Sequence, residues 1–113
     1  MATRIFTCSA TLGAGDANTE LSGSPISPPS GIKWTIVELR VENAMASHVD
    51  GYFDTEKYHT IYQEDVNQHT EPHIVALDIV QPHAYHVFAS DDSGAGGDVK
   101  VTVIVEESPQ TGA

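Results

Sequence analysis

Histidine is the residue type in this chain best suited to chemistry, because imidazole binds metals and titrates near neutral pH. The six histidines are His48, His59, His69, His73, His83 and His86. A zinc-binding helix needs two histidines on one helical face, and Pro72 interrupts the spacing from His69 to His73. In a strand, the spacing of three sends His83 and His86 to opposite faces. We therefore predict exposed or interface histidines and assign no metal ligand.

Acidic residues and the single thiol are the next candidates. Asp91, Asp92 and Asp98 share one glycine-rich segment. Their spacing does not match a calcium-binding EF-hand loop, so we predict a solvated turn, with a structural cation as the alternative. Cys8 shares one face of its predicted strand with Phe6, Ala10 and Leu12 and is predicted to be a core residue. The sequence contains no glycine-rich phosphate loop and no Gly-x-Ser-x-Gly elbow, so we assign no catalytic or cofactor-binding residue.

Aromatic side chains offer a third kind of chemistry, because exposed rings can stack against sugars. The candidates for such a surface are Trp34, Tyr52, Phe53, Tyr58, Tyr62 and Tyr85. Packing in a core and a hairpin is the competing interpretation, since Phe53 falls in phase with Val49. A carbohydrate-binding surface is therefore kept as a second hypothesis.

Strands must position all of these residues, because apolar and polar side chains alternate almost throughout the chain. The clearest case is the last segment, where valines occupy every second position from Val99 to Val105 and Ile104 interrupts the polar face. Strands are expected at residues 5–12, 17–23, 32–43, 48–55, 57–63, 74–80, 83–90 and 98–106. Residues 64–72 are polar and without pattern, and we predict a loop there.

The long strand at residues 32–43 contains a break in this alternation. Val37, Leu39 and Val41 share one face, whereas Trp34 and Ile36 fall on the polar parity. Either a β-bulge shifts the register between Ile36 and Val37, or both faces are covered at this end.

These elements define the expected fold. About eight strands without a convincing helix or repeat predict an all-β protein, a single antiparallel β-sandwich of jelly-roll or Greek-key type. A length of 113 residues suits one domain, spanning residues 1–113. Residues 108–113 are expected to form a flexible C-terminal tail.

The charge balance limits the partners that the chain is expected to bind. Sixteen acidic and five basic residues give a formal net charge of −11. Without a lysine or arginine cluster, binding to nucleic acid or to an anionic membrane is not expected. The sequence also shows no apolar run of transmembrane length and no signal-peptide pattern. The acidity fits a high-salt environment or a simple role in solubility.

A series of segments carries a family resemblance. A Ser/Pro-rich loop ends at Ser30-Gly31-Ile-Lys-Trp34, and a long strand follows at residues 35–42. The segments at residues 75–80 and 85–90 and the valine-rich final strand complete the series. The arrangement resembles small accessory proteins of tailed-virus heads and tails, especially those of haloarchaeal viruses. The resemblance implies a β-sandwich that decorates a capsid, forms vertex turrets or builds spike bases.

The resulting prediction is a non-enzymatic structural protein of the virion, with no cofactor. Its expected partners are further copies of itself, as a homo-oligomer, and other capsid or tail proteins. A carbohydrate-binding or receptor-recognition sandwich is the alternative. A metal-dependent cupin-like enzyme is a third hypothesis, although the sequence lacks the His-x-His pair that cupins use.

Overall fold

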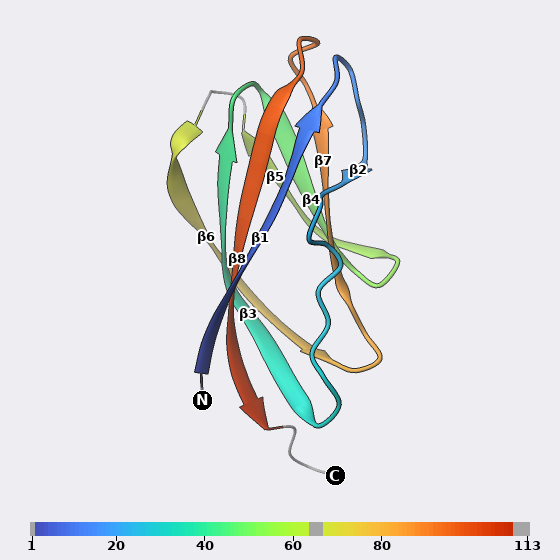
Figure 1. Cartoon of the computed structure of the whole chain (residues 1–113), viewed down its shortest axis with the longest axis vertical. Helices are drawn as coiled ribbons and strands as arrows, with labels where there is room; N and C mark the ends of the chain where they lie inside the picture. The colour runs from blue at the N-terminus through green and yellow to red at the C-terminus, as the bar shows by residue number, and fades with distance from the viewer. Residues whose placement is uncertain (1, 64–66, 110–113) are drawn as a thin grey trace.

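In the computed structural model, eight strands form two antiparallel sheets of four strands that pack face to face (Figure 1). The structure describes residues 2–63 and 67–109, and the side chains of residues 67–71 are left aside. The strands are β1 (Ala2–Leu12), β2 (Thr19–Glu20), β3 (Ile32–Asn43), β4 (Ser47–Phe53), β5 (Glu56–Gln63), β6 (Asn67–Val80), β7 (Tyr85–Asp91) and β8 (Gly97–Pro109). None of the described residues belongs to a helix that is long and apolar enough to span a membrane.

The strand order identifies the sandwich as a jelly roll. Sheet A has the order β1-β8-β3-β6, and sheet B has the order β2-β7-β4-β5. The hairpin of β4 and β5 stays within sheet B, and each of the other connections crosses from one sheet to the other. Eight strands wound in this way are a double Greek key, which is the jelly-roll arrangement. The predicted all-β sandwich is confirmed.

The predicted loop at residues 64–72 is wrong over most of its length. Strand β6 begins at Asn67, which lies opposite Asn43 of β3. Because β6 is an edge strand of sheet A, it needs no continuous apolar pattern to pair along one side. The first half of β6 is therefore a strand although its sequence is polar. Residues 64–66 of the predicted loop lie outside the described residues.

The C-terminal boundary also differs from the expectation. Strand β8 continues to Pro109, with Ser108 opposite Lys33 and Pro109 opposite Ile32. Residues 108 and 109 therefore belong to sheet A, and the predicted tail began too early. Residues 110–113 lie outside the described residues.

A β-bulge in β3 explains the broken alternation of that strand. The pairing of β3 with β8 shifts register between Ile36 and Glu38 and skips Val37. Trp34 and Ile36 consequently share the buried face with Leu39. Val37 is only half-buried and is not the core residue that its parity predicted. Of the two alternatives for this strand, the bulge is confirmed.

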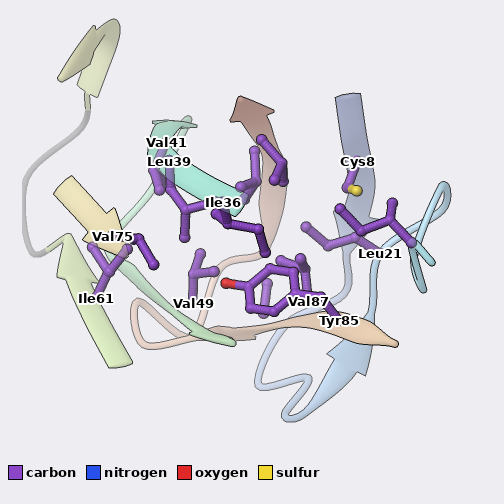
Figure 2. Packing of buried hydrophobic residues seen from close by; sticks show 14 of the residues in the cluster. Cys8, Leu21, Ile36, Leu39, Val41, Val49, Ile61, Val75, Tyr85 and Val87 are labelled. Carbon is purple, nitrogen blue, oxygen red and sulfur yellow. The ribbon is translucent and has the colours of Figure 1, made fainter. Parts of the chain in front are cut away.

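The core fills the space between the sheets (Figure 2). Every second residue of β8 from Val99 to Val105 is buried, as the alternation predicted. Cys8 of β1 and Tyr85 of β7 are also fully buried. Full burial of a valine, leucine or isoleucine side chain contributes about 1.5–3 kcal/mol. The core therefore stabilises the sandwich without a disulfide.

Candidate interaction surfaces

Three of the residues with candidate chemistry lie in the core. Burial raises the pKa of the Cys8 thiol, and the negative charge of Glu20 raises it further. The side chain therefore stays a neutral core group. Trp34 is 7% exposed, and its indole Nε1 donates a hydrogen bond to Glu107 (2.9 Å). Tyr85 is fully buried between the sheets. Trp34 and Tyr85 are therefore removed from the predicted sugar-binding rings.

A partly buried polar pair lies beside this core. The Nε2 atom of His59 and the hydroxyl of Tyr85 are hydrogen-bonded at 2.5 Å. Burial lowers the pKa of His59 and raises the pKa of Tyr85, so both partners are neutral near pH 7. Gly51, directly opposite His59 in the β4–β5 pairing, leaves room for the two rings. His59 of β5 thus has a structural partner in Tyr85 of β7, which belongs to the same sheet on the far side of β4.

The outward side of sheet B carries a second group of polar and aromatic residues, which we call the sheet B face. Its centre is Asp50 of β4, with His48 and Tyr52 on the same strand. On one side, β7 contributes Ser90, Phe88 and His86. On the other side, β5 contributes Tyr62, Thr60 and Lys57. Asp50 is therefore surrounded on all sides by neighbouring side chains.

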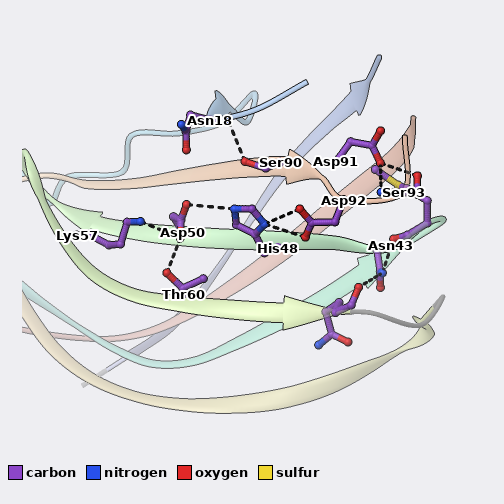
Figure 3. Close-up of polar contacts among 12 residues, drawn as sticks. Asn18, Asn43, His48, Asp50, Lys57, Thr60, Ser90, Asp91, Asp92 and Ser93 are labelled. Carbon is purple, nitrogen blue, oxygen red and sulfur yellow. Dashed lines mark hydrogen bonds and ion pairs between the residues drawn. The ribbon is translucent and has the colours of Figure 1, made fainter. Parts of the chain in front are cut away.

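Asp50 is buried although it points away from the core. Its carboxylate accepts a hydrogen bond from the Thr60 hydroxyl (2.5 Å) and lies 3.7 Å from the Lys57 ammonium (Figure 3). The His48 Nε2 atom lies 3.8 Å from the other carboxylate oxygen. The Asp50 side chain is only 2% exposed. A buried charge is costly unless it is paired, so these contacts hold the surrounding side chains around it.

Aromatic rings cover much of the sheet B face. Tyr62 is 68% exposed, and its ring centroid lies 5.4 Å from that of His48. Tyr52 meets Phe88 edge to face at 5.2 Å, and the Lys57 ammonium lies 6.0 Å from the Tyr52 ring centre. Of the predicted sugar-binding residues, Tyr52 and Tyr62 are therefore brought to one face.

The remaining two aromatic candidates lie elsewhere. Phe53 packs against the core, with its ring 4.9 Å from that of His83. Tyr58 lies at the bulge of β5, where its hydroxyl donates a hydrogen bond to the Ala76 carbonyl of β6 (3.3 Å). The six predicted aromatic residues thus do not form one platform.

Three histidines contact carboxylates on neighbouring elements. The pairs are His48–Asp92 (2.8 Å), His83–Asp54 (2.6 Å) and His86–Glu20 (2.7 Å). His83 and His86 therefore have separate partners, and His73 contacts Gln63 (3.1 Å). Over the residues whose side chains are described, no three His, Cys, Asp or Glu side chains gather into a potential metal site. His69 lies outside that part of the chain.

Two of the partner carboxylates have lowered pKa values. The Ala84 N–H and then the His83 ring hold the pKa of Asp54 below its ordinary value. Burial alone would raise the pKa of Glu20. The hydrogen bonds that its carboxylate accepts, from His86 and then from Ser24, outweigh burial and lower this pKa overall. The stability that both carboxylates contribute is therefore present above their ordinary pKa values and lost as the pH falls through the lowered ones.

Asp91 joins two loops at one end of the sandwich. Its carboxylate accepts hydrogen bonds from the Ser93 hydroxyl (2.6 Å; Figure 3), the Gly15 N–H (2.9 Å) and the Gly96 N–H (3.0 Å). These bonds, with that from Ser93 the strongest, hold its pKa well below the ordinary value. Asp91 is therefore a buried anchor and not part of the solvated turn that we predicted, while Asp98 bonds separately to β1.

The outward side of sheet A, the sheet A face, carries a row of isoleucines. Register aligns Ile5 of β1 with Ile104 of β8, then Glu38 of β3, then Ile74 of β6. Ile5 is 65% exposed and Ile74 is 81% exposed. The row crosses the middle of the sheet from one edge strand to the other. Ile104, between Ile5 and Ile74, is half-buried. Two exposed isoleucines aligned with a third are a feature of interaction surfaces rather than of scattered surface residues.

Charges on the sheet A face are mixed and paired. Its outward ionisable side chains are Lys33, Arg40, Lys100, Glu38, Glu42, Asp78, Asp98 and Glu106. Their formal charge is −2, which leaves −9 of the total −11 to the rest of the chain. Ion pairs link Lys33 to Asp78 (3.9 Å) and Lys100 to Glu42 (3.8 Å). A hollow of about 560 Å³ lies beside the second pair.

The isoleucine row was not identified from the sequence. Ile5 and Ile104 fall on the polar parity of their strands, and Ile74 begins the predicted sixth strand on that same parity. Apolar residues at outward positions of three strands are a signal that was available. Their alignment into one row depends on the strand order, which the sequence did not provide.

Searches against protein-family models and against curated proteins find no match to this chain. The topology and the two outer faces are therefore the observations from which a function can be inferred.

Proposed function

We propose that this chain is a non-enzymatic structural component of a virus particle, located on the particle surface as a capsid decoration, turret or spike-base protein. It works there as a homo-oligomer in contact with other capsid or tail proteins. The observation that carries the proposal is the isoleucine row on the sheet A face, in which Ile5 and Ile74 are exposed. Water contact with these side chains is unfavourable, so a protein surface that covers them gains stability.

The topology and the resemblance support the choice of a particle protein. Jelly rolls are common among viral capsid domains, although lectins and cupins share the architecture, so the fold alone does not select among them. The resemblance to accessory proteins of tailed viruses favours the first class. A surface position also suits a chain of charge −11, because it has no need to contact packaged DNA.

Sedimentation velocity of the full chain at low and at molar salt tests the assembly. We expect association that strengthens with salt, because screening reduces repulsion between copies of charge −11 while apolar contacts persist. The same protein should co-sediment with purified capsids of a haloarchaeal tailed virus. A chain that stays monomeric at high concentration in both salts and binds no capsid would contradict the proposal.

A carbohydrate-binding module is the second candidate, and the sheet B face favours it. Tyr62 and Tyr52 lie there beside His48 and Lys57, which are hydrogen-bond donors suited to sugar hydroxyls. A glycan array with a Tyr62→Ala variant as the comparison distinguishes this function. Trp34, which is buried, is not an informative position for that test.

A further inference from the structure

We infer that the sheet A face binds a second copy of this chain, in a two-fold arrangement whose axis runs parallel to the strands between β8 and β3. The inference rests on the proposed function, and it names the surface and the partner through which the homo-oligomer forms. Four properties of the described residues support it: area, charge, symmetry of the isoleucine row and exchange of ion-pair partners.

The sheet A face is large enough for a stable dimer. Four strands at a spacing of about 4.8 Å, each about 11 residues long at about 3.3 Å per residue, present roughly 700 Å². Stable interfaces bury about 800 Å² on each partner. Many other outward positions are small, including Thr7, Ser9, Ala76 and Thr102, so two such faces can approach closely. The face can therefore supply most of the required area.

Charge is compatible with self-association through the sheet A face. A second copy also carries −11, so it is repelled wherever acidic residues are unpaired. The sheet A face has a formal charge of −2 and contains three of the five basic residues of the chain. A copy that approaches through this face therefore meets only weak repulsion, so the partner can be the chain itself.

Symmetry then selects the axis. An axis along the isoleucine row would set Glu38 against Glu38 of the second copy, which is a like-charge contact. An axis parallel to the strands between β8 and β3 sets β1 over β6 and β8 over β3. Because Ile5, Ile104, Glu38 and Ile74 share one row, this axis brings Ile5 against Ile74 of the second copy. It also sets Ile104 against Glu38 of the second copy, whose carboxylate is paired with Arg40 on its own strand. The Ile5–Ile74 pair occurs twice in such an isologous interface.

The same axis exchanges partners between ion pairs. Lys100 of β8 lies beside Glu42 of β3 within one copy, at 3.8 Å. With β8 over β3, Lys100 of each copy also faces Glu42 of the other. Opposite charges therefore meet at two symmetric points on either side of the axis, at the same end of the face as the hollow beside Lys100.

Substitution of the two exposed isoleucines tests the surface. In the full chain at molar salt, Ile5→Ser and Ile74→Ser should each weaken dimerisation at least about tenfold, because each change removes two contacts per dimer. Tyr62→Ser, which alters the equally exposed ring of the sheet B face, is the matched control and should leave the dissociation constant unchanged. Circular dichroism melting curves verify that each variant is folded.

Charge reversal tests the arrangement. Lys100→Glu alone and Glu42→Lys alone should each weaken dimerisation, and the double variant should restore it. If the wild-type chain associates but the isoleucine variants associate equally well, the inference is overturned while the proposed function stands. If Tyr62→Ser alone disrupts the dimer, the sheet B face is the interface and the inference is again wrong. A wild-type chain that is monomeric throughout overturns the assembly in the proposed function as well.

Discussion

Replacing Gly51 by alanine is expected to destabilise the sandwich by about 2–4 kcal/mol, a large cost for a single methyl group. A Cβ atom at this position would overlap the His59 ring and the Tyr85 hydroxyl. Either β4 moves away from β5, or the partly buried hydrogen bond between His59 and Tyr85 is broken. Urea unfolding followed through the fluorescence of Trp34, the single tryptophan, measures the change.

Gly13→Ala is the control for this prediction. A Cβ atom there would meet only the carboxylate of Asp16, an exposed side chain that can turn away by giving up its hydrogen bond from the Gly13 N–H (2.7 Å). Its expected cost is about 1 kcal/mol or less, because that bond is exposed to water. Equal costs at Gly51 and Gly13 would show that the His59–Tyr85 pair does not fill the space beside Gly51.

The bulge in β3 leads to the second large effect. Ile36→Ala should cost about 2–5 kcal/mol, because the Ile36 side chain is fully buried between the sheets. Val37→Ala should cost about 1 kcal/mol or less, since Val37 lies at the bulge and is half-buried. Both values come from urea unfolding at one protein concentration, so that association does not alter the comparison.

Strict alternation along β3 predicts the reverse order of these two costs. On that pattern Val37 belongs with Leu39 in the core, and Ile36 belongs on the polar side. A larger loss of stability in Val37→Ala than in Ile36→Ala would therefore mean that β3 has no bulge at this position.

Much of the fold was predictable because one face of most strands is buried. In β8 the valines from Val99 to Val105 alternate with polar residues and Ile104. Each of these valines is buried in the structure. Cys8 in β1 and Tyr85 in β7 follow the same rule. A buried sheet face imposes a period of two on the sequence, and that period was visible without any relative for comparison.

The failures share a physical cause, which is that neighbours across strands are not visible in a sequence. The first half of β6 is polar because it forms an edge, so it lacked a strand pattern. Asp50 is buried on an outward position only because side chains from β5 and β7 enclose it. The alignment of Ile5 with Ile74 likewise depends on which strands lie between them.

The two outer faces now have different characters. The sheet B face surrounds a buried carboxylate with rings and donors, and it remains available for the carbohydrate-binding alternative. The sheet A face is nearly balanced in charge and is crossed by exposed isoleucines. An oligomer that forms through sheet A would leave the sheet B face, which lies on the opposite side of the sandwich, directed outwards from the assembly.

Cysteine cross-linking tests the central claim, self-association through sheet A, most directly. Cys8 is fully buried, so an introduced surface cysteine is the reactive thiol in the folded chain. Thr102 lies on the sheet A face between Thr7 and Arg40, close to the inferred axis. With a short bismaleimide at molar salt, Thr102→Cys is predicted to form covalent dimers, whereas Tyr62→Cys on sheet B is not. Dimers from Tyr62→Cys and none from Thr102→Cys would contradict the account.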